Sequence, residues 1–128
     1  MGPSCGGKTS ILQRHCHNNF SHQYMATIKS EAITSELTIN NNQLEIAIND
    51  TSGIDNKRSL ISNFYKTANV VILVYDITSR ESFEKLTNYY SDLSYFNSNN
   101  DLIVIVGNKV DLIDDSTEKG NLSFLNKK

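Results

Sequence analysis

This sequence has few cysteines, no long apolar stretch and no excess of positive charge. It has only two cysteines, Cys5 and Cys16, which fit no disulfide framework, and this usage suits a reducing cytoplasm. No stretch approaches the ~20 apolar residues that a membrane-spanning helix needs. Because 12 Lys and Arg residues are balanced by 14 Asp and Glu residues, the charge favours no nucleic-acid partner. The length of 128 residues suits one domain, spanning residues 1–128. We therefore expect a compact cytoplasmic protein.

The first motif is a phosphate-binding loop at residues 2–9, whose sequence GPSCGGKT matches G-x-x-x-x-G-K-[ST] at every fixed position. A glycine-rich turn exposes backbone N–H groups that converge on phosphate oxygens, and the N-terminus of a following helix adds positive potential. Lys8 would reach the β- and γ-phosphates, and the Thr9 hydroxyl would coordinate Mg²⁺. Residues 8–16 contain no Gly or Pro, which predicts that helix. We expect its shared face to carry Ile11, Leu12 and His15.

Two further motifs each follow a predicted strand. Residues 50–53, DTSG, come after an alternating apolar segment. The carboxylate of Asp50 suits Mg²⁺ at a strand end, and the Gly53 amide could meet a γ-phosphate. Residues 108–111, NKVD, follow a continuous apolar run. The carboxylate of Asp111 can accept hydrogen bonds from N1–H and the 2-amino group of guanine, whereas adenine offers neither donor. The three motifs in this order indicate a guanine nucleotide.

The apolar periodicity predicts an α/β fold. Alternating apolar residues on both sides of the polar turn at 40–42 predict a two-strand hairpin. These residues are Ile33, Leu37, Ile39, Leu44, Ile46 and Ile48. Continuous apolar runs at 70–75 and 102–106 predict parallel strands covered on both faces. Helical spacing between the runs predicts a helix, with Thr78 and Glu81 as a capping box at its start. Its predicted core residues are Phe83, Leu86, Tyr90, Leu93 and Phe96.

On these motifs the chain resembles a small GTPase of the Ras superfamily, most like the Rab branch, from the phosphate loop to Asp111. Residues 20–28 look like the first switch region and residues 64–68 like the end of the second. Residues 74–78 and 81–83 look like the Rab-type strand and helix that follow. The resemblance implies the three-layer α/β fold of a P-loop NTPase with a mostly parallel sheet. It also implies an enzyme that hydrolyses GTP and acts as a switch in vesicle trafficking.

The resemblance further implies which residues bind nucleotide and metal. The nucleotide-binding set would be Ser4, Cys5, Gly6, Gly7, Lys8, Thr9, Ser10, Thr27, Asp50, Gly53, Asn108, Lys109 and Asp111. Within this set, Mg²⁺ would be held by Thr9, Thr27 and Asp50. Thr27 would contact the γ-phosphate only in the GTP state, while Gly53 would meet the γ-phosphate through its amide. Exchange factors and effectors would bind through the switch regions.

The chain departs from the family pattern at the catalytic position and at the partner surface. Ile54 stands where small GTPases usually carry a Gln that orients the attacking water. Because an aliphatic side chain can neither donate nor accept a hydrogen bond, we expect slow hydrolysis. Lys29 replaces a glycine, and Ala32 and Asn49 stand where Rab proteins typically carry Phe and Trp. Since these aromatics usually form an exposed patch that effectors bury, we expect weakened effector binding.

The resemblance also implies parts of the fold that have no counterpart in the chain. These parts are a first strand before Gly2, in the middle of the sheet, and a last strand and helix after Asp111. We therefore expect a fragment or divergent gene product with a split sheet, marginal stability and a poorly defined segment at 114–128. No C-terminal cysteine is present for prenylation, so membrane association would need partners or a longer form.

Three functional interpretations follow. The leading one is a Rab-like GTPase switch that uses GTP, GDP and Mg²⁺ and hydrolyses slowly. The second is a nucleotide-binding scaffold that never hydrolyses, for which Ile54 is the discriminating residue. The third is a non-functional remnant whose motifs persist without a complete fold.

Overall fold

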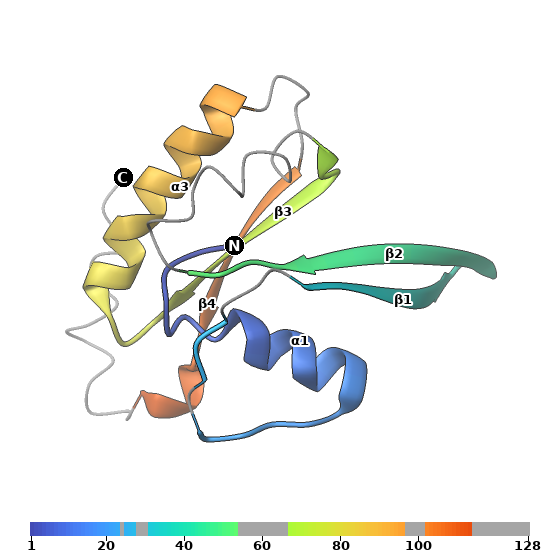
Figure 1. The fold of residues 1–128 in the computed structure, drawn as a ribbon, viewed down its shortest axis with the longest axis horizontal. Coiled ribbons are helices and arrows are strands. Elements are labelled where there is room, and N and C mark those ends of the chain that lie inside the picture. Colours follow the sequence, from blue (N-terminus) through green and yellow to red (C-terminus); the bar gives the residue numbers. More distant parts are fainter. Residues whose placement is uncertain (24, 28–30, 54–66, 97–101, 114–128) are drawn as a thin grey trace.

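The computed structural model describes residues 1–23, 25–27, 31–53, 67–96 and 102–113. In chain order these form α1 (Lys8–His17), β1 (Glu31–Ile39), β2 (Asn42–Asp50), β3 (Val70–Asp76), α3 (Arg80–Phe96), β4 (Leu102–Asn108) and the short 3₁₀ helix η2 (Val110–Leu112) (Figure 1). The α/β class is confirmed. Ile54 and the segment 114–128, which is predicted to be poorly defined, lie outside the described residues.

The hairpin is confirmed, with β1 and β2 paired antiparallel. Ile33 lies opposite Ile48 and Leu37 opposite Leu44, so the alternating apolar side chains share one face of the ladder. The turn is tighter than predicted, because β2 already begins at Asn42. Asn40 and Asn41 have φ of 50° and 64°. Asn tolerates this left-handed region better than most residues, and two-residue hairpin turns require it.

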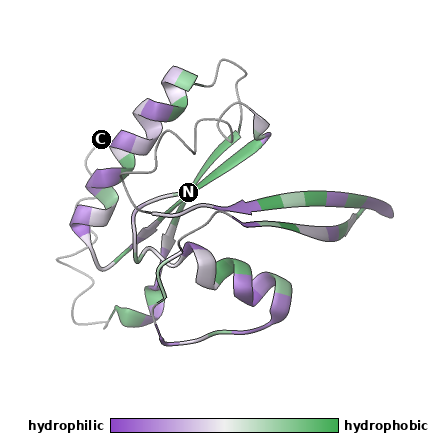
Figure 2. Cartoon of the chain, viewed as in Figure 1, coloured by the Kyte–Doolittle hydropathy of each residue, from purple (hydrophilic) through white to green (hydrophobic). Residues whose placement is uncertain are grey.

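The two continuous apolar runs form β3 and β4, which pair in parallel as predicted. Figure 2 shows both strands as almost uniformly hydrophobic, whereas the hairpin strands mix hydrophobic and hydrophilic residues. Alternate residues of β3 point at α3 and form the main core with it. This core consists of Val71, Leu73, Tyr75, Leu86, Tyr89 and Leu93. The predicted core position Tyr90 is wrong: its side chain is 55% exposed, and the neighbouring Tyr89 is buried instead.

Among the described residues, helical cover is present on one face of the β3–β4 pair only. The other face carries Val70 and Ile72 with their register partners Leu102 and Val104, and all of them are exposed. The prediction that both faces are covered is therefore not met by the described elements. The packing of α3 therefore covers β3, the strand that pairs with β4 before the 108–111 motif.

The described strands form two separate two-stranded sheets. Beside β3, the Met1 amine donates a hydrogen bond to the Ile72 carbonyl at 2.6 Å, and the Met1 carbonyl accepts one from the Val74 N–H at 2.8 Å. Figure 1 shows the N-terminus lying between the hairpin and β3. The predicted division of the sheet is therefore observed, and Met1 attaches the start of the phosphate loop to β3.

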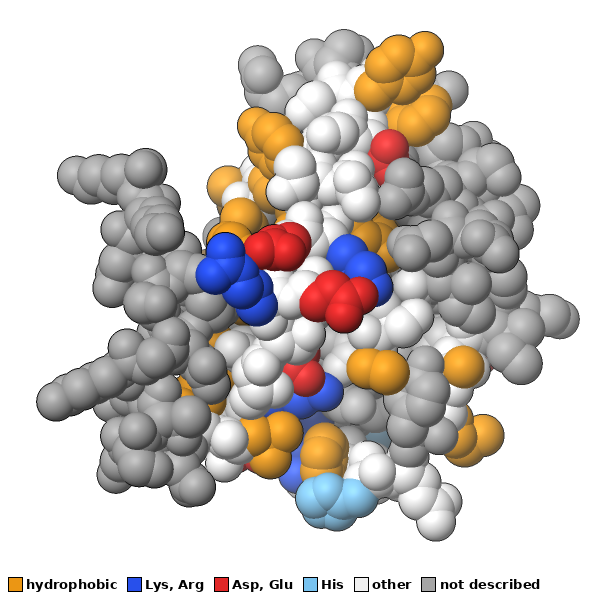
Figure 3. Space-filling view, turned by 90° about the vertical axis from the view of Figure 1, so that its left-hand side faces the viewer, with side chains coloured by type: hydrophobic (Ala, Val, Ile, Leu, Met, Phe, Trp, Pro, Cys, Tyr) orange, Lys and Arg blue, Asp and Glu red, His pale blue; other side chains and the backbone are white. Residues whose placement is uncertain are grey.

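The two helices differ from their predicted details. The predicted helix over 8–16 is confirmed as α1, and its spacing places Ile11, Leu12 and His15 on one side. Of these three residues only Leu12 is buried, while Ile11 and His15 are exposed. Figure 3 views the side of the molecule that carries α3 and shows acidic and basic side chains next to one another. On this helix Arg80 pairs with Glu84 and Lys85 with Glu81, each four residues apart. Neither described helix has the length and apolar character needed to cross a membrane.

The start of α3 is capped by Ser79, not by Thr78. The Ser79 hydroxyl accepts a hydrogen bond from the Ser82 N–H at 3.2 Å, which is the usual contact of an N-cap side chain. The predicted capping box is therefore wrong. Thr78 donates its hydroxyl to Asp76, and Glu81 pairs with Lys85.

We predict that Ser79→Ala lowers the free energy of unfolding by about 1 kcal/mol, because an N–H at the helix start loses its acceptor. The matched control is Ser94→Ala, which removes a hydroxyl that donates to the Tyr90 carbonyl within the same helix. This control should be neutral or slightly stabilising, since Ala has the higher helix propensity. Thermal unfolding followed by circular dichroism measures both variants. Equal melting temperatures for the two would contradict the assignment of Ser79 as the cap.

Candidate nucleotide-binding site

The phosphate loop is a tight turn between Met1 and α1. The Gly6 N–H donates to the Pro3 carbonyl at 3.4 Å, and Gly7 caps α1 with φ of 90°. A Cβ built on Gly7 would overlap the side-chain nitrogen of Asn108, and one on Gly6 would lie 3.1 Å from the Val74 carbonyl oxygen. Gly7 is thus required by its approach to Asn108 at the end of β4 and by its backbone conformation, whereas Gly6 makes a tight contact with β3.

Lys8 folds back over the loop that precedes it. Its ammonium donates to the Pro3 carbonyl at 2.8 Å. Burial lowers the pKa of Lys8, and the negative charge of Asp50 opposes that shift in part. A desolvated cation above a glycine-rich turn is a strong attractor for phosphate oxygens, which would replace the carbonyl as its partner.

The predicted metal ligands Thr9, Thr27 and Asp50 meet at one point. The Thr9 hydroxyl donates to Asp50 Oδ2 at 2.6 Å and lies 2.7 Å from the Thr27 hydroxyl. Because the single proton of Thr9 is directed at Asp50, Thr27 is the donor in the second bond. Asp50 itself is only 7% exposed. A buried carboxylate with two hydroxyls is a set of oxygen donors that fits Mg²⁺.

Gly53 lies against the phosphate loop from the other side. Its carbonyl accepts a hydrogen bond from the Ser4 hydroxyl at 2.9 Å. A Cβ at Gly53 would come within 2.5 Å of the Ser4 nitrogen and 2.7 Å of Lys8 Nζ. The preceding residues Thr51 and Ser52 are buried, so the segment after β2 is held in place. Gly53 is therefore near the groups that would bind the terminal phosphate.

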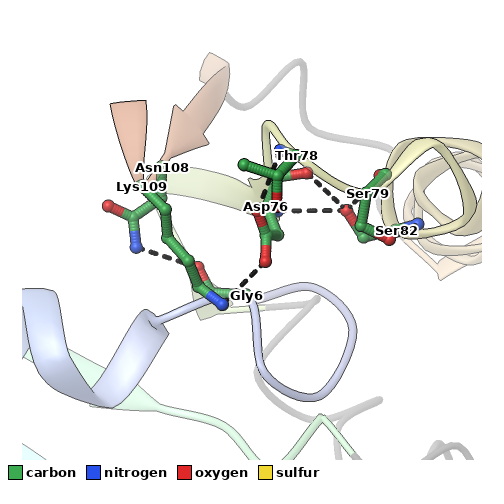
Figure 4. Close-up of polar contacts among 7 residues, drawn as sticks. All are labelled: Gly6, Asp76, Thr78, Ser79, Ser82, Asn108 and Lys109. Atoms are coloured by element: carbon green, nitrogen blue, oxygen red, sulfur yellow. Dashed lines mark hydrogen bonds and ion pairs between the residues drawn. The ribbon is translucent and has the colours of Figure 1, made fainter. Parts of the chain in front are cut away.

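The segment predicted to bind the base follows β4. Asn108 donates its side-chain N–H to the Gly6 carbonyl at 2.9 Å, which joins this segment to the phosphate loop (Figure 4). Lys109 has φ of 67° and precedes η2, in which Asp111 is exposed. Because the carboxylate of Asp111 is exposed, a base can reach it.

Asp76 is a functional candidate that the sequence analysis missed. Its Oδ2 is 2.7 Å from Lys109 Nζ, and its Oδ1 accepts two hydrogen bonds from Thr78. Burial by itself raises the pKa of Asp76, but the hydrogen bonds from Lys109 and Thr78 outweigh it and hold the pKa below its ordinary value. The available signal was an acidic residue at the C-terminal end of a parallel strand, in register with Asn108.

The remaining predicted residues divide into those the structure places and those outside it. Ser4 and Cys5 are exposed on the loop, and Ser10 is half-buried in the first turn of α1. Ala32 and Asn49 form one exposed cross-strand pair of the hairpin. The predicted positions Lys29, Ile54 and 64–66 lie outside the described residues.

The sequence is similar to proteins of one known family. The Ras family model matches residues 1–123. The Ras-related protein Rab-21 from Homo sapiens is 38% identical over 112 residues, which cover 88% of this chain and 50% of the relative. RabQ from Dictyostelium discoideum is 35% identical over 122 residues, covering 93% of the chain and 60% of the relative. Rab-18-B from Danio rerio is 38% identical over 112 residues, covering 87% and 55%.

The chain thus spans between 50% and 60% of the length of these relatives. The matched region contains the phosphate loop, the Asp50 segment and the Asn108 segment, which the fold brings to one site. The chain belongs to the Ras family and is a Rab-like small GTPase of the Ras superfamily.

Proposed function

We propose that this chain binds guanine nucleotide together with Mg²⁺ and acts as a Rab-like switch in vesicle trafficking, with slow hydrolysis of GTP. The observation that carries the proposal is the convergence of two distant segments on the glycine loop and the start of α1. Thr9 contacts Asp50 across 41 positions, and Asn108 contacts Gly6 across 102. Both contacts join residue types that the chemistry of nucleotide binding requires.

The phosphates would be held by the backbone of the loop, by Lys8 and by the N-terminus of α1. Thr9, Thr27 and Asp50 would hold Mg²⁺, which supplies charge neutralisation between the β- and γ-phosphates. Thr27 and Asp50 both already lie within hydrogen-bond distance of Thr9, so little rearrangement would be needed to turn the three oxygens toward one ion.

The base would be selected by the segment after β4. Asp111 would accept both guanine donors, while Asn108 would keep the segment attached to the loop. ATP would leave the carboxylate without partners and would therefore bind more weakly. We therefore expect the site to bind both GDP and GTP, and to bind them more tightly than adenine nucleotides.

The switch would depend on the segments that carry Thr27 and Gly53. Among the described residues, Thr27 contacts Thr9 through its side chain, and Gly53 contacts Ser4 through its carbonyl. A γ-phosphate placed between them would gain contacts with both, whereas GDP would not. Such a difference in contacts between two nucleotide states is what a switch requires.

A nucleotide-binding scaffold that never hydrolyses is the second candidate, and Ile54 favours it. Without a hydrogen-bonding side chain at that position, water is not oriented for attack. The two candidates share the binding site and differ in a single measurable rate.

We predict that fluorescent GDP binds the purified chain in a Mg²⁺-dependent manner and is displaced by GTP but not by ATP. Asp50→Asn should reduce the enhancement by Mg²⁺ at least about tenfold, because a charged ligand is lost. Glu45→Gln removes the same charge from an exposed position of the hairpin and should bind like the parent chain. Competition by ATP as effective as that by GTP would refute guanine selectivity, and absence of saturable binding would refute the function.

We predict that Ile54→Gln increases the single-turnover rate of GTP hydrolysis by roughly tenfold, since one hydrogen bond to water is regained. Ile54→Leu is the matched control and should leave the rate unchanged, because it adds no polar group. The slow-hydrolysis proposal fails when the parent chain already hydrolyses GTP at an ordinary Ras-like rate, on the order of 10⁻⁴ per second.

We predict that an effector of broad Rab specificity binds the parent chain weakly and binds Ala32→Phe/Asn49→Trp more tightly. The two positions form one exposed cross-strand pair, so the added rings would lie side by side. The control Thr38→Phe/Gln43→Trp adds the same rings at another exposed pair nearer the turn. Titration calorimetry compares them with a standard Rab. Equal affinity of the parent chain and that Rab would show that the aromatics are not needed.

A further inference from the structure

The Asp76–Lys109 pair links two elements that the proposed function uses separately. Lys109 stands in the base-binding segment after β4, and Asp76 ends the neighbouring strand β3. We propose that Asp76 is a positioning residue that holds Lys109, and with it the segment 108–111, in the arrangement that receives guanine. This inference rests on the proposed function, because it concerns the same site.

The carboxylate of Asp76 is fixed in direction by three donors. Lys109 Nζ approaches Oδ2 at 2.7 Å, while the Thr78 N–H and hydroxyl approach Oδ1 at 2.9 and 2.6 Å (Figure 4). The Thr78 contacts occupy one oxygen and leave the other directed at Lys109. These contacts hold the carboxylate in the orientation in which Oδ2 faces the Lys109 ammonium.

The backbone of Asp76 is fixed as well. The Ser82 hydroxyl accepts a hydrogen bond from the Asp76 N–H at 3.0 Å and lies 2.9 Å from the Asp76 carbonyl oxygen. The Ser82 N–H in turn bonds to the cap residue Ser79. Figure 4 shows this chain of contacts running from the start of α3 to Lys109. The position of Asp76 is therefore set by the part of the fold that packs on the core.

Pairing with Asp76 matters more for Lys109 than an ion pair does for an ordinary surface lysine. Its side chain is 29% exposed and that of Asp76 is 15% exposed, so both charges are partly removed from water. Its backbone occupies the left-handed region, with φ of 67° and ψ of 36°, which disfavours residues with a Cβ. Contacts from neighbours are required to hold that conformation, and Asp76 provides the only charge paired with Lys109 among the described residues.

The same strand ends reach the phosphate loop. The Ile77 N–H donates to the Asn108 carbonyl at 3.0 Å, and Asn108 donates to Gly6 at 2.9 Å. Loss of the Asp76 charge would release Lys109 from its position between β3 and the loop. The expected consequence is a base-binding segment that closes less completely on its ligand and lets it leave sooner.

The test measures release of fluorescent GDP from the full chain, its Asp76→Asn and Lys109→Met variants, and the double variant. Asn keeps the shape of the side chain and an acceptor for Thr78, but lacks the charge. We expect about tenfold faster release in each single variant. The double variant should release no faster than the quicker single variant, because both changes break one interaction. Glu84→Gln, which removes an exposed carboxylate paired with Arg80 on α3, should release GDP like the parent chain.

Melting temperatures of the same proteins without nucleotide, together with Leu93→Val, separate positioning from general destabilisation. Leu93→Val leaves a small cavity in the core beside α3 and should lower the melting temperature, while it removes none of the polar contacts of Asp76. For positioning, release in Asp76→Asn is faster than its melting temperature accounts for on the Leu93→Val scale. Multiplicative effects in the double variant, or release that simply follows melting temperature, overturn the inference.

The outcomes also distinguish this inference from the proposed function. When the parent chain binds GDP and Asp76→Asn releases it at the parental rate, the positioning role is overturned and the proposed function stands. When the parent chain binds no guanine nucleotide, both are overturned, and the melting temperatures then report only whether the charge pair stabilises the fold.

Discussion

The phosphate loop is the part of the chain that joins its two groups of elements. The described helices and strands pack as α1 with the hairpin and as α3 with the β3–β4 pair. The loop and the helix that follows it contact both groups. Thr9 bonds to Asp50 at the end of β2, while Met1 and Gly6 bond to Val74 and Asn108 of the other sheet. Because glycines allow these strand ends to approach the loop so closely, the geometry of the site and the arrangement of the two sheets depend on the same short turn.

The parts of the fold that could be predicted are those whose signal is local. The hairpin follows from alternation around an Asn-rich turn, and the parallel pair follows from two continuous apolar runs. The errors arise where adjacent residues compete for one role. Tyr89 and Tyr90 differ by one position on a helix, and only the direction from which β3 packs decides which is buried. Ser79 and Thr78 are adjacent residues that could both cap α3. Ser79 does so, because the Thr78 hydroxyl donates to the carboxylate of Asp76 instead.

The site residues that could be predicted are those that belong to a motif. The loop, Asp50 and Asn108 were found because each lies in a motif whose residue spacing is itself the signal. Asp76 was missed because its role depends on a partner 33 positions away, which becomes its neighbour only through the register of two strands. A strand-end carboxylate alone does not identify its partner. The partner of Asp76 becomes known when the strand register places Asp76 opposite Asn108, which Lys109 directly follows.

The division of the sheet has a physical consequence for the proposed ligand. Between the described groups, the attachments of the loop are a few hydrogen bonds rather than a shared apolar core. A nucleotide bound to the loop would touch Asp50 from one group and the Asn108 segment from the other. Its binding free energy would then add to the free energy that holds the groups together, by an amount that grows with the logarithm of ligand concentration. If the described residues hold most of the contacts between the two groups, the nucleotide would act as a structural component as well as a ligand.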